Sequence, residues 1–392
     1  MSPRQHESHQ SLLAHRDRAA VSGAAMDAII VPTARPPAYL RQAIAVAGER
    51  DVLLLVLCSK RSTGSDAILE AKNAGVRALA LDVDLLDPGL VPDFATDRLL
   101  RFTRFRRLTD TSFKRNLALL IAVLAGWKRI LFLDDDIELP NPADLGVAAA
   151  LLGEYPVVGL ANAGMPDNSV VCHAIRDAGG TQDTFIGGGA LAVGEAAFSS
   201  FFPNIYNEDW FFLLDGMKLR PSAITGTAIQ KPYNPYRDTR RARNEELGDT
   251  LAEGVFGLFD SELGLPQADK AYWREFLADR RRIIRDTIDQ VEAAPIESGE
   301  RARMVDSLRA AIGRSLLISP ELCVRYLRAW QRDCVSWRQR VTDLRRDHHG
   351  GSGVEHAVEA LGIPLLAQSA FDVKVSTGAK RRSGAPRFAA SA

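Results

Sequence analysis

The sequence has few cysteines and no long apolar segment, and both absences narrow the class of protein. The cysteines are only four and lie far apart without a Cys-x-x-Cys pair: Cys58, Cys172, Cys323 and Cys334. This usage indicates neither a disulfide framework nor a zinc site, and it fits a reducing cytoplasm. The longest apolar stretch, 117–127, is too short to cross a bilayer, and the first 26 residues contain no apolar segment of a signal peptide. We therefore expect a soluble, cytoplasmic protein without a membrane span.

The chain also lacks a net charge, because 49 Lys and Arg residues balance 49 Asp and Glu residues. This balance argues against a general nucleic-acid binder, although local basic patches are compatible with it. One such patch, RLLRFTRFRRL (98–108), holds five arginines with aromatic spacing. This patch could be an exposed edge, or it could bind a phosphorylated acceptor or nucleic acid. The zero net charge of the chain favours the exposed edge.

Short, continuous apolar runs are present, and they alternate with segments of helical spacing. Such runs are typical of the buried strands of a parallel sheet. Their alternation with helices predicts an α/β fold with right-handed crossovers. The predicted strands are 27–32, 51–58, 77–84, 129–136, 157–161, 185–193 and 222–230.

The composition divides the chain into four parts. Residues 1–26 are polar and predict a disordered arm, and residues 27–262 contain the strand–helix alternation. Residues 263–346 have a helical pattern throughout and predict a helical extension. Residues 347–392 begin with HHGGSG and end in a basic, low-complexity stretch, which predicts a linker and a tail.

Three consecutive carboxylates, Asp134, Asp135 and Asp136, follow the apolar run ILFL at the end of a predicted central strand. Adjacent carboxylates repel one another, and they do so more strongly near a protein interior than in water. A bound cation or an arginine is therefore expected beside them, and a solvated strand end is the remaining alternative. Because strand side chains alternate between faces, we expect Asp134 and Asp136 to converge while Asp135 points elsewhere. Two convergent carboxylates suit a hard cation such as Mg²⁺ or Mn²⁺.

Four motifs, in this order, resemble the family 2 type of nucleotide-sugar glycosyltransferase with the GT-A fold. They are VPTARP (31–36), CSKRST (58–63), KRNLAL (114–119) and FLDDDI (132–137). The resemblance covers about residues 27–230 and implies a GT-A-like catalytic domain over 27–262, with a mixed, mostly parallel sheet flanked by helices. It also implies that the protein moves a sugar from a nucleotide-diphosphate donor to a hydroxyl of a small, soluble acceptor.

The resemblance assigns roles to particular residues. Asp136, assisted by Asp134, would hold Mn²⁺ or Mg²⁺, which would stabilise the charge of the leaving diphosphate. Asp209 of the pair Glu208–Asp209 matches the catalytic base of inverting members, which removes the acceptor proton. The other reading of this pair is an acidic helix start capped by Asn207. The residues that the resemblance places on the nucleotide-sugar are Pro32, Thr33, Arg35, Ser59, Arg115, Asn116, Asp134, Asp135, Gly188 and Gly189.

The sequence departs from this family in three places. The base-binding turn is Ser59-Lys60-Arg61 without an acidic residue, which leaves the donor base open. The QxxRW motif of processive members is absent. No histidine that could serve as a third metal ligand occurs between His173 and His348, and a retaining enzyme therefore stays open.

Other classes of function also remain open at this point. A phosphatase of the haloacid dehalogenase type carries its nucleophile in a strand-end DxD, but that motif normally lies near the start of its domain. A non-catalytic GT-A-like binding or scaffold protein would retain the fold without the chemistry, and a sugar-nucleotide-forming transferase is a further alternative. The expected partners are the donor and a small acceptor, without nucleic acid, and the C-terminal helices are candidates for pairing two chains.

Overall fold

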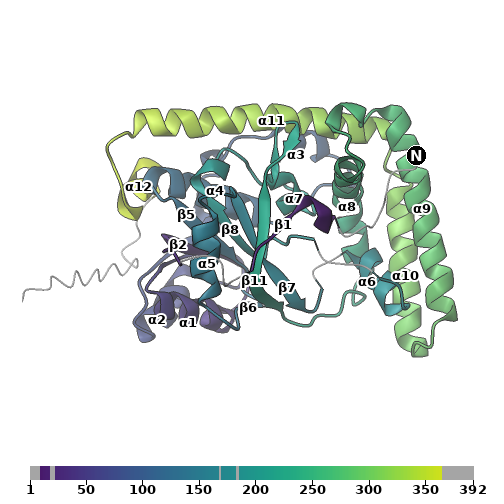
Figure 1. Cartoon of the computed structure of the whole chain (residues 1–392), viewed down its shortest axis with the longest axis horizontal. Helices are drawn as coiled ribbons and strands as arrows, with labels where there is room; N and C mark the ends of the chain where they lie inside the picture. The colour runs from purple at the N-terminus through teal and green to yellow at the C-terminus, as the bar shows by residue number, and fades with distance from the viewer. Residues whose placement is uncertain (1–8, 18–22, 167–168, 182–184, 364–392) are drawn as a thin grey trace, which may run out of the picture.

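A computed structural model describes residues 9–17, 23–166, 169–181 and 185–363. Within these residues the chain folds around a mixed, mostly parallel β-sheet with helices on both faces (Figure 1). The expected α/β class, with a mostly parallel sheet and flanking helices, is therefore confirmed.

The strands correspond closely to the apolar runs of the sequence. Their bounds are β1 (Ala14–His15), β2 (Ala28–Thr33), β3 (Leu53–Cys58), β4 (Ala78–Asp82), β5 (Arg129–Leu133), β6 (Ile137–Glu138), β7 (Val157–Gly164), β8 (Ala190–Gly194) and β11 (Ser222–Gln230), with a separate hairpin of β9 (Leu214–Asp215) and β10 (Lys218–Leu219). Strand β8 is shorter than expected, because the glycine run precedes the strand instead of lying within it.

The order of the strands creates a crevice at one edge of the sheet. Among the described residues the order is β1-β11-β7-β8-β5-β2-β3-β4, and β8 is antiparallel to both of its neighbours. The chain proceeds from β2 through β3 to β4 and then returns to place β5 on the other side of β2. Ligands of open α/β sheets bind at such a switch point, beyond the carboxyl ends of the strands. The segments that follow β2 and β5 carry Arg35 and Asp134–Asp136, so the topology brings both motifs to this edge.

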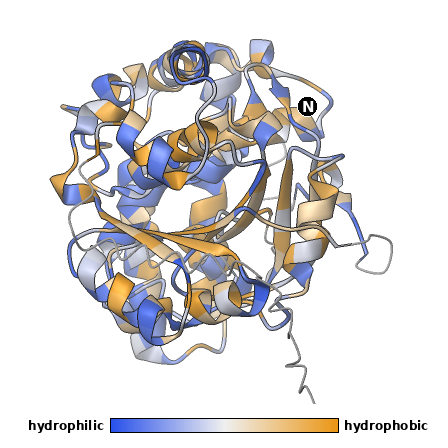
Figure 2. Ribbon diagram, turned by 90° about the vertical axis from the view of Figure 1, so that its left-hand side faces the viewer, coloured by the Kyte–Doolittle hydropathy of each residue, from blue (hydrophilic) through white to orange (hydrophobic). Residues whose placement is uncertain are grey.

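Two layers of helices cover the sheet. The helices are α1 (Arg41–Arg50), α2 (Gly64–Asn73), α3 (Ala95–Leu100), α4 (Thr111–Ala125), α5 (Asp144–Leu151), α6 (Val170–Asp177), α7 (Glu208–Phe212), α8 (Thr239–Asp260), α9 (Lys270–Ala293), α10 (Ser298–Ser315), α11 (Pro320–Asp347) and α12 (Val354–Ala360). Alternate residues of β2 enter two cores, with Ile29 facing α1, α2 and α5, and Ile30 facing α4. Figure 2 shows the apolar strands between these two helical layers.

The C-terminal helices share a core with the sheet. Helix α11 crosses the top of the molecule in Figure 1 and connects the side formed by α9 and α10 with α12. Trp273 of α9 and Trp337 of α11 belong to the same buried cluster as Phe132 of β5. The helical pattern of residues 263–346 is therefore observed, while the domain boundaries placed in the sequence stay a prediction.

Residues 354–360 differ from the expected linker and tail. They form α12, which packs on α4 with Val354, Ala357 and Val358 buried. Apolar residues at helical spacing form this stripe, so burial stabilises a short helix where the glycine-rich HHGGSG segment ends. The basic stretch 374–392 lies outside the described residues.

The prediction of a disordered arm over residues 1–26 is wrong for residues 9–17. Strand β1 pairs in parallel with β11 at the sheet edge, and a short 3₁₀ helix, Gln10–Leu12, precedes it. The His9 side chain is only 1% exposed and lies between Glu253 and Asp260 of α8. Residues 1–8 and 18–22 lie outside the described part of the chain.

No helix in the described residues is both long and apolar enough to span a bilayer.

Candidate functional site

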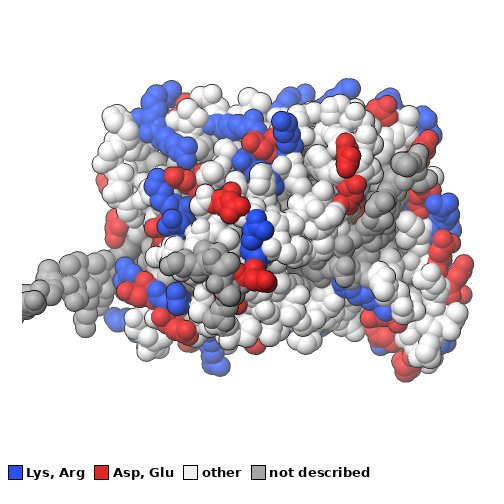
Figure 3. Space-filling model, in the orientation of Figure 1, with Lys and Arg blue, Asp and Glu red and all other residues white. Residues whose placement is uncertain are grey.

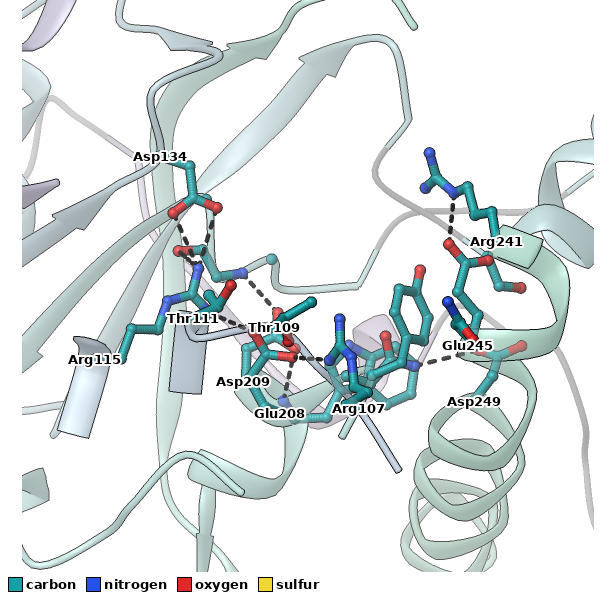
Figure 4. Close-up of a pocket in the computed structure, with 18 of the residues that line it drawn as sticks. Arg107, Thr109, Thr111, Arg115, Asp134, Glu208, Asp209, Arg241, Glu245 and Asp249 are labelled. Carbon is teal, nitrogen blue, oxygen red and sulfur yellow. Dashed lines mark hydrogen bonds and ion pairs between the residues drawn. The ribbon is translucent and has the colours of Figure 1, made fainter. Parts of the chain in front are cut away.

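A cleft of about 690 Å³ opens between the carboxyl edge of the sheet and α8. This volume is typical of sites for small ligands. Figure 4 shows Asp134, Arg115 and Asp209 on one side of the cleft, with Arg241, Glu245 and Asp249 on the α8 side. Of the residues assigned from the sequence, those that line the cleft are Arg35, Arg115, Asp134, Gly188, Gly189, Glu208 and Asp209.

Arg115 is the buried cation at the centre of the sheet side of this cleft. Its Nη2 donates to both carboxylate oxygens of Asp134, each at 3.1 Å, and its Nη1 donates to Glu208 Oε1 at 3.1 Å. Burial alone would lower the pKa of Arg115, but the charges of Asp134 and Glu208 outweigh burial and raise it. Arg115 was expected on the donor diphosphate, and the structure instead shows it shared between two carboxylates of the protein.

The other two carboxylates of the DDD stretch share Arg35. Arg35 Nη1 lies 3.0 Å from Asp135 Oδ1, and its Nη2 donates to Asp136 Oδ2 at 2.8 Å. Thr33 also donates to Asp135, at 2.6 Å. The expected convergence of Asp134 and Asp136 on one cation stays a prediction, because each carboxylate is paired with a different arginine. The three residues follow β5 in a turn, closed by a bond from the Ile137 N–H to the Asp134 carbonyl, so strand alternation does not apply to them.

The carboxylates at this strand end are paired with arginines, so the described residues show no formed site for the expected divalent cation. Asp134 binds Arg115 and Asp136 binds Arg35, while the charge of Asp136 also acts on Asp134. In the part of the chain that the structure describes, no three His, Cys, Asp or Glu side chains are grouped so that they could hold a metal ion. Mg²⁺ in phosphate sites typically binds one or two carboxylates together with phosphate oxygens of the ligand, and here guanidinium groups pair with those carboxylates.

Asp134 lies in an environment that disfavours its charged form. Burial and the neighbouring carboxylates of Asp136 and Asp135 raise the pKa of Asp134 to about 7, although Arg115 opposes this change. The charge of the DDD stretch is therefore balanced by two arginines in distinct pairs. A strongly perturbed carboxyl in a cleft is typical of functional sites, although structural ion pairs produce the same perturbation.

The glycine run gives Arg115 the space that it occupies. A Cβ atom added to Gly188 would lie 2.5 Å from Arg115 Nη1. The Gly188 carbonyl accepts from Arg115 Nη2 at 3.2 Å, so backbone and guanidinium are in direct contact. At Gly189 the added atom would lie 3.0 Å from Ile137. A side chain at either position would collide with Arg115 or Ile137 and would push the glycine run away from the end of β5.

Asp209 faces the cleft from the first turn of α7. Its Oδ2 accepts a hydrogen bond from the Gly188 N–H at 2.6 Å, and its Oδ1 accepts one from the Trp210 N–H at 3.1 Å. The capping role considered for Asn207 is not observed, because its side chain donates instead to Asp249 of α8 at 3.2 Å. Backbone donors therefore fix the orientation of the Asp209 carboxylate at the wall of the cleft.

Five of the residues assigned to the nucleotide-sugar do not line this cleft: Pro32, Thr33, Ser59, Asn116 and Asp135. Asn116 is buried and exchanges two hydrogen bonds of 2.8 Å with the backbone of Phe202, which ties α4 to the chain before α7. Ser59 accepts a bond from Lys114 at 2.6 Å, and Lys114 also donates to the Thr33 carbonyl at 2.8 Å. The buried Lys114 thus links the turns that follow β2 and β3. Pro32 and Thr33 lie at the end of β2.

The α8 wall of the cleft was not expected from the sequence. Arg241 pairs with Glu245 at 2.5 Å and stacks on the Tyr233 ring at 4.3 Å. Asp249 accepts a bond from the buried Arg280 at 2.7 Å. A usable signal was present, because Glu245, Asp249 and Glu253 repeat every four residues along this helix. Such spacing places acidic side chains on one face of a helix that packs against the protein.

Comparisons with known proteins give one distant structural likeness. No family model matches the sequence, and no curated protein sequence matches it. Among solved structures, the chain is similar to the mannosyltransferase PcManGT from Pyrobaculum calidifontis in complex with GDP-Man and Mn²⁺. The likeness has a TM-score of 0.41 at 14% identity and covers 82% of this chain and 90% of that chain. Similarity at this level does not identify a family or a ligand for this protein.

Proposed function

We propose that this protein is a nucleotide-sugar glycosyltransferase that moves a sugar to a hydroxyl of a small acceptor. One observation carries the proposal: segments far apart in the sequence meet at one cleft. Arg35, Asp134, Gly188 and Asp209 all line it, and the sequence resemblance assigns each of them to the donor or to the chemistry. The cleft also lies at the switch point of a mostly parallel sheet, where nucleotides bind in folds of this class.

Charge explains how the cleft would serve a diphosphate leaving group. As the bond from the anomeric carbon to the diphosphate oxygen breaks, negative charge accumulates on the diphosphate. Arg35 is 43% exposed at the cleft wall, so its guanidinium can turn from Asp136 toward a ligand. Planar guanidinium groups form paired hydrogen bonds with phosphate oxygens. Arg115 supports this arrangement from behind, because it fixes Asp134 and Glu208.

In this proposal Asp209 acts as the base in an inverting transfer. The acceptor hydroxyl gives its proton to an Asp209 oxygen while the hydroxyl oxygen forms a bond to the anomeric carbon. The bond from that carbon to the diphosphate breaks on the opposite face, and the diphosphate leaves with the electron pair. The backbone donors at Gly188 and Trp210 hold the carboxylate in one orientation, which such a proton transfer requires.

The phosphatase alternative loses support from the same geometry. Asp134, the first carboxylate of the DxD stretch, would act as the nucleophile in that chemistry. Both of its oxygens accept hydrogen bonds from the buried Arg115, which restrains it from attacking a phosphorus atom. The other alternative, a non-catalytic scaffold protein, predicts that Asp209→Asn changes nothing in the release of nucleoside diphosphate.

The test is the release of nucleoside diphosphate from a panel of nucleotide-sugars, measured with wild type and with Asp209→Asn. Loss of the base predicts a rate lower by about 10²- to 10⁴-fold at an unchanged melting temperature. His15→Gln, an exposed substitution far from the cleft, serves as the control. Equal release by wild type and Asp209→Asn, or release of inorganic phosphate from simple phosphate esters, would contradict the proposal.

A further inference from the structure

The loop between α3 and α4 contains arginines whose charges are not balanced by carboxylates. Arg98 and Arg101 both pair with Asp93, at 2.9 and 3.2 Å, and Arg107 pairs with Glu208 at 3.3 Å. Arg104 and Arg106 are exposed, and neither forms an ion pair with any residue that the structure describes. Of the five arginines in residues 98–108, three are therefore paired with carboxylates, whereas Arg104 and Arg106 remain able to bind a ligand.

Two arginines from other helices join them. Arg314 of α10 donates to the Arg104 carbonyl, and its guanidinium lies 5.5 Å from the centre of the Phe105 ring. Arg243 of α8 is exposed and donates to Thr239 Oγ1 at 3.0 Å. Within the described chain neither side chain forms an ion pair with a carboxylate, although the charge of Arg243 reaches Asp238, whose pKa is lowered by hydrogen bonds from Arg240 and by both arginine charges. Arg104, Arg106, Arg243 and Arg314 are referred to together as the arginine cluster.

The members of the arginine cluster lie close enough to repel one another. The pKa of Arg314 is lowered by burial and by the positive charges of Arg243 and Arg104. On the face shown in Figure 3, basic and acidic side chains both occur, and many of them lie next to one another. A chain with zero net charge that leaves four arginines together therefore concentrates positive charge at one place.

The arginine cluster lies at the edge of the cleft. Arg106 lines the cleft itself, and Arg104 and Arg243 line a small adjoining hollow that shares Arg106, Arg107 and Tyr206 with it. This hollow has a volume of about 10 Å³ and is too small to enclose a phosphate group. An anion would therefore bind at its mouth, among exposed guanidinium groups, while the rest of the ligand extends into the cleft.

We propose that the arginine cluster binds a phosphate group of the acceptor, so that the acceptor is a small phosphorylated compound with a free hydroxyl. The acceptor assignment rests on the proposed glycosyl transfer, whereas the anion site rests on the four arginines alone. Guanidinium groups bind phosphate through paired, charge-assisted hydrogen bonds. A phosphate anchored at the edge of the cleft would direct the hydroxyl of the same molecule toward Asp209, which lines the same cleft.

The test measures binding of inorganic phosphate by calorimetry at constant ionic strength. In Arg104→Gln/Arg243→Gln the affinity for phosphate is expected to fall about tenfold or more, because two charged donors are lost. The control is Arg274→Gln/Arg328→Gln, which removes two exposed arginines from α9 and α11 and is expected to leave affinity unchanged. Equal phosphate binding in wild type and the cluster variant would overturn the proposal.

Two further arms separate this inference from the proposed function and from nucleic-acid binding. Nucleoside diphosphate binding should be the same in wild type and the cluster variant. If nucleotide binds normally but phosphate binds equally well to wild type and the cluster variant, the inference is wrong and the proposed function is unaffected. If no nucleotide binds, glycosyl transfer and the acceptor assignment fail together, even where phosphate binding depends on the cluster. If a single-stranded oligonucleotide binds through the cluster and phosphate does not displace it, the cluster binds nucleic acid. That result would overturn the proposal that the cluster binds a small phosphorylated acceptor.

Discussion

Arg115 donates hydrogen bonds to both carboxylate oxygens of Asp134, and the two distances are equal at 3.1 Å. The side chain of Arg115 is 4% exposed and that of Asp134 is 31% exposed, so a buried guanidinium holds a carboxylate at the cleft wall. The same guanidinium also binds Glu208, which belongs to the helix that carries Asp209. Arg115 therefore connects the strand-end carboxylates with the candidate base, and the integrity of the site depends on it.

Removal of Arg115 should destabilise the protein strongly. Arg115→Met removes the buried partner of Asp134 and one of the two arginines that pair with Glu208, and breaking a buried pair typically lowers the free energy of unfolding by about 3–5 kcal/mol. Arg35→Met, at a partly exposed ion pair, should cost about 0–1 kcal/mol. Urea denaturation of both variants measures the difference. Equal destabilisation would contradict the central position given to Arg115.

Gly188→Ala should be destabilising for a steric reason. The added methyl group would lie 2.5 Å from Arg115 Nη1 and force the guanidinium away from its carboxylates, which we expect to cost about 1–3 kcal/mol. Gly313→Ala is the matched control, because nothing lies within 4 Å of its added Cβ in α10. There the substitution should stabilise by about 0.5–1 kcal/mol through helix propensity. Thermal unfolding of the two variants should therefore give shifts of opposite sign.

The N-terminal segment should contribute stability that depends on pH through His9. Burial alone would lower the pKa of His9, but its hydrogen bonds to Asp260 and Glu253 outweigh burial and raise it to about 9. A raised pKa in the folded state means that this contribution is fully present below about pH 6.5 and is lost as pH rises through 9. The shift corresponds to about 3 kcal/mol.

The measurement compares the pH dependence of unfolding in wild type and His9→Gln. The difference in stability between the two proteins should shrink as pH rises from 6.5 to 9. His15→Gln, at an exposed position of the same segment, should follow the wild-type curve. A constant difference between wild type and His9→Gln across this range would show that the protonated His9 pair does not stabilise the fold.

Nucleotide binding should not require a divalent cation. Arg35 and Arg115 pair with the three DDD carboxylates and already balance their charge. Calorimetric titration of a nucleoside diphosphate should therefore give affinities within about twofold in EDTA and in Mn²⁺. Affinity that appears only with Mn²⁺ would mean that the arginines release these carboxylates to a metal.

The fold was predictable wherever the signal was local. The runs DAIIVP, DVLLLVLC and RILFL became β2, β3 and β5 because strands buried on both faces are apolar throughout. The order of residues 9–17 was not predictable, because His9 is held by partners 244 and 251 positions away. Helix α12 was missed although Val354, Ala357 and Val358 have helical spacing, since the glycine-rich segment before it suggested a linker.

The site was predictable as a set of motifs but not as a set of contacts. Sequence order placed Arg35, Asp134 and Asp209 at strand ends or helix starts, and the structure brings them to one cleft. Strand alternation could not predict that Arg35 joins Asp135 to Asp136, because a turn begins immediately after Leu133. Asn116 looked like a ligand-binding residue because its partner, the Phe202 backbone, lies 86 positions away.

The most direct test of the account is whether the cleft binds a nucleoside diphosphate. Melting temperatures would be measured with UDP, GDP, ADP and dTDP for wild type, for Asn244→Trp, and for Asn73→Trp as a control. Asn244 is exposed on α8 and lines the cleft, so a tryptophan there would obstruct it, whereas Asn73 is exposed at the end of α2. We predict that one nucleotide at about 100 times its dissociation constant stabilises wild type and Asn73→Trp by about 2.7 kcal/mol and raises their melting temperatures, without effect on Asn244→Trp. No shift with any nucleotide, or the same shift in all three proteins, would contradict a nucleotide site in this cleft.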